Sequence, residues 1–317
     1  MPSVPPPTRD TAVRLEWHVL PRPLRDAVAA RCGSPVVAAH SRTRGFTPGF
    51  ASVLECEDGS RHFVKAASLR AQRMFATAYR EEARKLAVIP AEVPAPALQW
   101  VMDDEWVVLG IDHLEGRHPA RPWRREELDA CLDSLEVVAT ELTPPPEGLV
   151  VSDAVDDLAP FLEHWEVVRT APPDLPLLAE HLDEAVELAR GYAAVVGGDT
   201  VVHSDLRDDN VLIDGAGRAW FCDWNFPVRG ASWLDSLLLL IGPRGDGLDV
   251  DQVIAARPLL RDVPADGLDA VIALVTGYFL KSMADPVPPT SPRVRDHQRW
   301  QAEVCWEWLC QRRGWGS

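Results

Sequence analysis

The sequence predicts an α+β fold with two lobes, the first built on an antiparallel sheet and the second mainly helical. Short runs rich in β-branched residues follow one another through residues 35–114, and turn residues separate them. Residues 115–317 are instead dominated by longer segments with helical periodicity. The first 34 residues form an N-terminal extension whose start we expect to be disordered.

The first lobe combines extended runs with a single helix. The helix is expected over residues 68–86, because neither Gly nor Pro interrupts it, and it places Met74, Ala78, Glu82 and Leu86 on one face. The expected strands cover residues 35–40, 50–57, 61–66, 98–102 and 106–111.

The second lobe is read as a set of helices with three short strands among them. The expected helices cover residues 125–142, 156–169, 175–196, 233–241, 265–284 and 293–313. The expected strands cover residues 200–202, 211–213 and 219–222. Leu268, Ile272, Val275 and Phe279 form one helical stripe that we expect in the core.

Polar residues between these three strands carry the functional signal. His203, Asp205 and Asn210 stand in the order H-x-D-x-x-x-x-N, and Asp223 follows at the end of the next apolar run. A lone H-x-D is common, and such residues often only cap a turn. Strands on both sides of the loop and a second aspartate at a strand end are typical of the catalytic loop and metal-binding aspartate of a kinase.

Phosphoryl transfer explains why these residue types are needed. Its transition state spreads negative charge over phosphate oxygens, so the site needs Mg²⁺ held by oxygen ligands and a carboxylate that orients the attacking hydroxyl. Asn210 and Asp223 are the candidate Mg²⁺ ligands, and Asp205 is the candidate base. His203 is expected to play a structural part by bonding backbone near Asp223.

These motifs resemble those of the aminoglycoside phosphotransferase family, whose members share a bilobal fold with protein kinases. The resemblance extends from about residue 34 to the C-terminus and is most specific from His203 to Asp235. Family members usually read H-G-D and I-D-W, whereas here Ser204 and Cys222 replace the glycine and the isoleucine. The resemblance implies that Asp235 braces the catalytic loop. It also implies a nucleotide-binding lobe over residues 35–114 and a helical lobe with the catalytic loop and acceptor site over residues 115–317.

The resemblance also assigns a phosphate-gripping lysine. Lys65 ends an alternating strand at the position where kinases keep the lysine that binds the α and β phosphates. Glu82 is its expected partner, and Glu81 should face elsewhere on the helix. A lysine at a strand end is otherwise usually only solvated.

Two backbone segments complete the expected nucleotide site. Gly45 and Gly49 would let a loop approach the phosphates, although a plain hairpin loop explains the same residues. The backbone from Gly110 through Asp112 to Leu114 would bond the adenine edge, and an ordinary β-hairpin is again the alternative.

The acceptor should be a small molecule. The connection between Asp223 and the apolar run at Trp233 is too short for the activation segment of a protein kinase. A net charge of -16 argues against nucleic acid and suits a cationic acceptor, although acidity also serves solubility. The acidic residues expected at the acceptor cleft are Asp156, Asp157, Glu163, Glu303 and Glu307.

Composition sets the remaining expectations. No apolar stretch reaches the roughly 18 residues of a membrane span, and the N-terminus does not read as a signal peptide, so we expect a cytoplasmic protein without a membrane partner. The six cysteines show neither a C-x-x-C pair nor zinc-like spacing and are interpreted as reduced thiols. A monomer and a homodimer are both compatible with the sequence.

The sequence therefore predicts an enzyme that uses Mg²⁺ to transfer the γ-phosphate of ATP or GTP to a hydroxyl of a small cationic acceptor, such as an aminoglycoside-type antibiotic. Antibiotic resistance and metabolism are both compatible with this reaction. A kinase of another antibiotic or metabolite would keep the same catalytic residues. A non-catalytic nucleotide-binding regulator is the third reading. Against it stands the complete set Lys65, Glu82, Asp205, Asn210 and Asp223, since a degenerate site would be expected to have lost a member.

Overall fold

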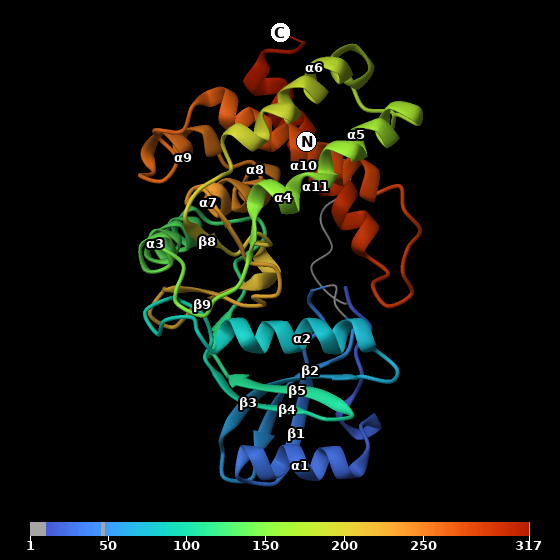
Figure 1. The fold of residues 1–317 in the computed structure, drawn as a ribbon, viewed down its shortest axis with the longest axis vertical. Helices are drawn as coiled ribbons and strands as arrows, with labels where there is room; N and C mark the ends of the chain where they lie inside the picture. Colours follow the sequence, from blue (N-terminus) through green and yellow to red (C-terminus); the bar gives the residue numbers. More distant parts are fainter. Residues whose placement is uncertain (1–10, 46–47, 317) are drawn as a thin grey trace.

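A computed structural model describes residues 11–45 and 48–316 of the chain and confirms the predicted α+β fold (Figure 1). The N-terminal lobe contains a five-stranded antiparallel sheet with the order β1-β2-β3-β5-β4. Helix α1 covers one face of this sheet, and α2 covers the other, on the side of the C-terminal lobe. The strands are β1 (Val36–Ser41), β2 (Phe50–Cys56), β3 (Arg61–Ser68), β4 (Leu98–Asp103) and β5 (Trp106–Asp112).

Strand alternation sorts side chains between the two faces of the sheet. In β3 the side chains of Val64 and Ala66 pack in the same cluster as α1, whereas Ala67 packs in the cluster that contains α2. Lys65 lies between Val64 and Ala66 and therefore points to the α2 face. The sheet thus directs Lys65 toward the C-terminal lobe.

Helix α1 (Arg22–Cys32) was not predicted from the sequence, which assigned these residues to an extension. Leu24, Val28 and Cys32 of α1 are buried against the sheet. The helix begins with Pro at its first turn and ends at Gly33, whose φ of 84° is a common way to terminate a helix. The start expected to be disordered, residues 1–10, lies outside the described residues.

Helix α2 (Arg73–Leu86) begins later than predicted, because Ser68 still belongs to β3. The face predicted to carry Met74, Ala78, Glu82 and Leu86 is not buried along its whole length, since Met74 is 73% exposed. Tyr79 occupies that face instead, together with Glu82 and Leu86. Glu82 is 1% exposed and points toward the sheet, where Lys65 lies.

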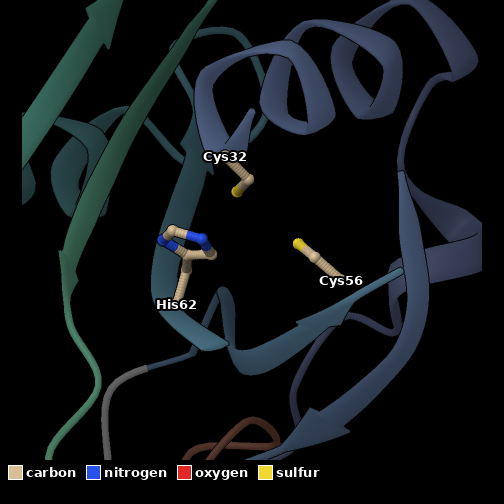
Figure 2. Close-up of side chains that lie close together, drawn as sticks. All are labelled: Cys32, Cys56 and His62. Carbon is tan, nitrogen blue, oxygen red and sulfur yellow. The ribbon is translucent and has the colours of Figure 1, made fainter. Parts of the chain in front are cut away.

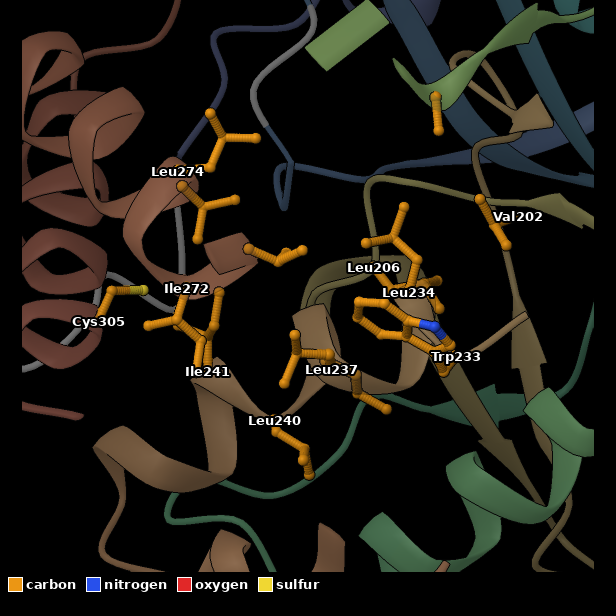
Figure 3. Packing of buried hydrophobic residues seen from close by; sticks show 14 of the residues in the cluster. Val202, Leu206, Trp233, Leu234, Leu237, Leu240, Ile241, Ile272, Leu274 and Cys305 are labelled. Carbon is orange, nitrogen blue, oxygen red and sulfur yellow. The ribbon is translucent and has the colours of Figure 1, made fainter. Parts of the chain in front are cut away.

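The C-terminal lobe is mainly helical. Its helices are α3 (Arg125–Glu141), α4 (Ala154–Leu158), α5 (Pro160–Thr170), α6 (Leu178–Arg190), α7 (Leu234–Leu239), α8 (Ile241–Gly245), α9 (Val250–Ala256), α10 (Ala265–Ser282) and α11 (Val294–Arg313). The helix predicted over residues 156–169 is in fact two, because α4 ends before Pro160 starts α5. Figure 3 shows the core, where Leu206 from the loop after Val202 lies beside Leu234 of α7, and Leu237 and Ile241 belong to the same cluster.

Short strands hold the loop that carries the predicted motif. The strands are β6 (Gly116–Arg117), β7 (Ser152–Asp153), β8 (Thr200–Val202), β9 (Val211–Asp214), β10 (Ala219–Phe221) and β11 (Val228–Gly230). They form two three-stranded sheets with the orders β10-β9-β6 and β7-β11-β8. The loop between β8 and β9 is therefore anchored in both sheets. Among the described residues, none of the helices combines the length and apolarity needed to cross a bilayer.

Candidate active site

Lys65 stands at the centre of a buried ion-pair cluster between the lobes. Its Nζ lies 2.7 and 2.9 Å from the two carboxylate oxygens of Glu82, and 2.7 Å from Oδ1 of Asp223. Burial alone would lower the pKa of Lys65, but the charges of Asp223 and Glu82 outweigh burial and raise it. The ammonium group therefore stays charged and joins β3 and α2 to the C-terminal lobe.

His203 connects the two segments that carry the motif. The amide of Asp205 donates to His203 Nδ1 at 3.3 Å, and His203 Nε2 lies 2.9 Å from the carbonyl oxygen of Cys222. With Nδ1 accepting, Nε2 carries the proton and donates to that carbonyl. Burial lowers the pKa of His203, which keeps the ring neutral. The buried imidazole thus fixes the loop of Asp205 beside Asp223.

Asp235, at the start of α7, holds the same loop through hydrogen bonds to its backbone. Its carboxylate accepts from the amide of His203 at 2.6 Å and from the amide of Ser204 at 2.8 Å. The side chain is 2% exposed. Both amides would otherwise be buried without a partner close to the reacting groups.

Ser204 takes a backbone conformation that favours glycine, the residue that the family resemblance leads us to expect at this position. Its φ is +64°, in the left-handed region that non-glycine residues other than Asn and Asp rarely adopt. The hydroxyl donates to the carbonyl oxygen of Phe226 at 2.5 Å. This hydrogen bond and the one from the Ser204 amide to Asp235 stabilise Ser204 in a backbone conformation that is otherwise unfavourable for serine.

Asp205 lies between Arg207 and Asn210. Arg207 donates to Asp205 Oδ1 through one guanidinium nitrogen, and its Nε lies 3.0 Å from Asp209 Oδ1. Burial raises the pKa of Asp205 to about 6, although the Arg207 guanidinium favours the ionised form. A carboxylate with a pKa near 6 is suited to accept a proton at neutral pH.

The residues predicted to hold Mg²⁺, Asn210 and Asp223, offer oxygen atoms, the ligand type that a hard cation prefers. The amide of Cys222 donates to the carbonyl oxygen of Asn210 at 2.8 Å, so Asn210 lies next to the segment of Asp223. Asn210 Nδ2 donates to the carbonyl oxygen of Asp205 at 2.8 Å, which leaves its amide oxygen for a cation. Lys65 and Asn225 both donate to Asp223 Oδ1. Among residues 11–45 and 48–316 no group donates to Oδ2, so this second oxygen can bind a cation.

Asp223 itself is held ionised. Burial would raise the pKa of Asp223, but the neighbouring Lys65 ammonium holds it below its ordinary value. Its φ of +69° is also in the left-handed region, which aspartate tolerates better than most residues. An ionised carboxylate oxygen beside an amide oxygen is the ligand type that Mg²⁺ prefers.

The N-terminal lobe places the predicted glycines in different surroundings. Gly45 has a φ of +87°, and a Cβ there would lie 3.8 Å from Asp209 Oδ2, so its loop reaches the catalytic loop. Gly49 has a φ of +125°, and a Cβ there would lie 3.1 Å from Tyr79 Oη. Packing against Tyr79 therefore already explains glycine at position 49. Residues 46 and 47 of this loop lie outside the described residues.

Gly110, the first residue of the expected hinge, lies inside a strand. Gly110 is inside β5, paired with Val64 on one side and Trp100 on the other, and a Cβ there would lie 2.1 Å from the Trp100 indole. Asp112 ends the strand, and its amide donates to the carbonyl oxygen of Ala97 at 2.9 Å. Leu114 lies in the connection between β5 and β6, where the backbone leaves the sheet.

A cavity of about 660 Å³ opens onto these groups between the lobes. Asp205, Asp223 and Arg207 line one part of it. The remaining wall is largely apolar and aromatic, and Phe161 and Tyr278 stack there with ring centroids 4.3 Å apart. The apolar and aromatic lining residues are Pro48, Phe75, Leu158, Phe161, Leu206, Phe226, Val228, Leu234, Leu238, Ile241, Val275, Tyr278, Phe279, Pro288 and Val294.

Of the acidic residues proposed for the acceptor cleft, Asp157 lines this cavity. The lining does not include Asp156, Glu163, Glu303 or Glu307. Glu163 and Glu307 are exposed on α5 and α11. The described lining therefore offers a cationic acceptor a single carboxylate beyond Asp205 and Asp223.

Sequence reasoning missed Arg207 and the aromatic wall. Arg207 stands inside the motif between Asp205 and Asn210, and a basic residue with three aspartates close to it in the sequence was a usable signal. Phe161 and Tyr278 come from α5 and α10, far apart in the chain. Nothing in their spacing indicates that they meet.

Comparisons with known proteins agree with this architecture. No protein-family model matches the sequence, and no curated protein matches it. Among solved structures, choline kinase LicA from Streptococcus pneumoniae is similar with a TM-score of 0.59 and 11% identity, over 92% of this chain and 98% of that one.

Two antibiotic phosphotransferases show the same relationship. Spectinomycin phosphotransferase in complex with ADP and spectinomycin has a TM-score of 0.58 and 12% identity, over 91% of this chain and 98% of that one. The GDP complex of an aminoglycoside 2′-phosphotransferase has a TM-score of 0.59 and 12% identity, over 90% and 95% of the two chains. The chain therefore has the protein-kinase-like bilobal fold of the aminoglycoside phosphotransferases and choline kinase.

Proposed function

We propose that this protein is a kinase that transfers the γ-phosphate of ATP or GTP to a hydroxyl of a small acceptor whose surface is largely apolar. The observation that carries the proposal is that Asp205 and Asp223 line one cavity between the lobes, where Lys65 bonds to Asp223 and Asn210 bonds to Asp205. Solved structures of the same fold hold ADP or GDP, which supports a nucleotide as the phosphate donor.

Each residue has a defined task in this reaction. Lys65, held by Glu82, aligns the nucleotide phosphates, and Asn210 with Asp223 would hold Mg²⁺, which neutralises phosphate charge when bound. Asp205 accepts the proton of the acceptor hydroxyl as its oxygen attacks the γ-phosphorus in line. Arg207 holds the Asp205 carboxylate in place.

The acceptor class follows from the cavity wall. Two of the three carboxylates that line the cavity, Asp205 and Asp223, have tasks in the proposed reaction, and Arg295 adds a positive charge to the same lining. A polycationic acceptor would find one spare carboxylate and much apolar surface there. An acceptor with an apolar body and one hydroxyl near Asp205 fits the wall better.

A singly charged cationic acceptor is the second candidate. Asp157 and the stacked rings of Phe161 and Tyr278 supply a carboxylate and aromatic faces on the same wall. The family resemblance also points to a cationic acceptor, of which the polycationic aminoglycoside-type antibiotics, with a role in resistance, are the more highly charged case.

The experiment is Mg²⁺-dependent release of ADP and GDP with a panel of hydroxylated acceptors. The panel pairs neutral apolar alcohols with amines of the same size and with aminoglycosides. We expect stimulation by acceptors with a large apolar surface. Stimulation by aminoglycosides alone would contradict the proposed acceptor class, and absence of both nucleotide binding and release would contradict a kinase.

A further inference from the structure

The N-terminal lobe carries a second cluster of reactive side chains, on the sheet face opposite Lys65. Cys32 ends α1, Cys56 ends β2, and His62 is near the start of β3. One ligand atom from each of the three lies within 4.8 Å of those from the other two. Figure 2 shows the two sulfur atoms and the imidazole ring turned toward the same space.

The register of the sheet explains why these side chains meet. His62 pairs with Leu54 across β2 and β3, and Cys56 follows Leu54 by two positions, so Cys56 and His62 share one face. That face is the one covered by α1, because Leu54 and Cys56 pack in the same cluster as Leu24. Cys32, at the last turn of α1, is thereby brought over the hairpin.

The donor set is that of a zinc site. Two thiolates and an imidazole are ligands that zinc accepts in tetrahedral geometry. Zinc–sulfur and zinc–nitrogen bonds of about 2.3 and 2.0 Å place tetrahedral ligand atoms about 3.5–3.8 Å apart. The three ligand atoms already lie within 4.8 Å of one another, so the distances between them need to shorten by at most about 1 Å for all three to bind one ion.

The surroundings also favour a cation. The Ser60 hydroxyl lies 3.1 Å from His62 Nε2 and donates to Asp58 Oδ1 at 2.7 Å. A polar chain thus runs from the Asp58 carboxylate to the imidazole and fixes the ring, as supporting groups do around metal-binding histidines. Cys32 and Cys56 are 8% and 3% exposed, whereas His62 is half-buried, so a fourth ligand can come from solvent.

We propose that Cys32, Cys56 and His62 bind one zinc ion, with water as the fourth ligand, and that this ion fastens α1 to the β2–β3 hairpin. Binding replaces the two thiol protons, which pass to the solvent, and it changes no oxidation state. The site is structural, since the sheet separates it from Lys65 and the cavity.

The test measures metal content and does not depend on the proposed kinase activity. The full chain, purified with reductant and freed of loosely held metal, is analysed for zinc by mass spectrometry and titrated with Co²⁺. We expect one zinc per chain and thiolate-to-cobalt charge-transfer absorption. Cys32→Ser and Cys56→Ser should lose both signals, whereas the matched control Cys310→Ser, at a similarly buried cysteine of α11, should keep them.

His62→Ala tests the third ligand with less risk to folding, because this side chain is half-buried. We expect zinc affinity to fall at least about tenfold, the loss already seen when residues that merely support a metal ligand are changed. Unchanged affinity in His62→Ala would remove His62 from the site. Failure of the reduced wild-type protein to take up zinc would overturn the proposal. A Cys32–Cys56 disulfide in the protein as isolated would overturn it as well, if the reduced protein also takes up no zinc.

Discussion

Lys65 and Asp223 join the two lobes through a direct ion pair, with 2.7 Å between Nζ and Oδ1. The same ammonium binds Glu82 of α2, so one charge holds a strand and a helix of the N-terminal lobe against the C-terminal lobe. The contact explains how residues far apart in sequence form one site. It also gives Lys65 a structural part in addition to the proposed contact with phosphates.

These two parts of Lys65 can be separated by substitution. Lys65→Met should destabilise the protein by about 3–5 kcal/mol, because Glu82 is left buried without its cation. The double variant Lys65→Met/Glu82→Leu removes that unpaired charge and should recover most of the stability. Both variants should bind Mg²⁺-nucleotide far more weakly than the wild type. Chemical denaturation and calorimetry measure the two effects.

The double variant is the control for misfolding. Recovered stability with wild-type nucleotide affinity would show that Lys65 is only structural. Stability no better than that of Lys65→Met would mean that Glu82 is not the group left unpaired.

The pH dependence of turnover should report Asp205. Because burial raises its pKa to about 6 and the group must be ionised to accept a proton, kcat/KM should fall as pH drops through about 6. A pH–rate profile measures this acidic limb. A profile that stays flat down to pH values near the ordinary pKa of aspartate would contradict the assignment.

Arg207 should determine the pH at which kcat/KM falls on the acidic side of the pH–rate profile. Arg207→Gln removes the positive charge beside Asp205, which disfavours the carboxylate, so the acidic limb should move to higher pH. Arg169→Gln, on the exposed surface of α5, is the matched control and should leave the profile in place. An unmoved limb in Arg207→Gln would show that the guanidinium does not act on Asp205.

Backbone strain at Ser204 gives a stability prediction. Ser204→Ala loses the hydrogen bond to Phe226 and keeps the φ of +64°, so it should be less stable by about 1 kcal/mol. Ser204→Gly loses the same bond but relieves roughly 1 kcal/mol of left-handed strain, so it should lie close to the wild type. Thermal unfolding compares the two, and an alanine variant at least as stable as the glycine variant would argue against strain.

The sequence was most informative where function restricts local spacing. The motif from His203 to Asp223 and the strands around it are local features, so periodicity and turn residues were enough to place them. The pairing of Lys65 with Glu82 rather than Glu81 followed from helix geometry, and the structure brings these two together.

Features that depend on tertiary packing escaped prediction. Met74 satisfies the same helical spacing as Glu82, but the buried face of α2 is centred on Tyr79, which packs near Gly49. The cavity wall is assembled from helices whose order in space cannot be read from periodicity. Cys32 and Cys56 showed no metal-like spacing, because the register of the sheet and the end of α1 bring them together with His62.

The most direct test of the proposed kinase is single-turnover transfer of labelled γ-phosphate to an acceptor by the wild type and by Asp205→Asn. The variant keeps the size of the side chain and one accepting oxygen, but its amide cannot accept the proton. We expect Mg²⁺-nucleotide affinity to stay within a few-fold and the transfer rate to fall by about 10²–10⁴. Transfer at the wild-type rate by Asp205→Asn would contradict the catalytic role on which the account depends.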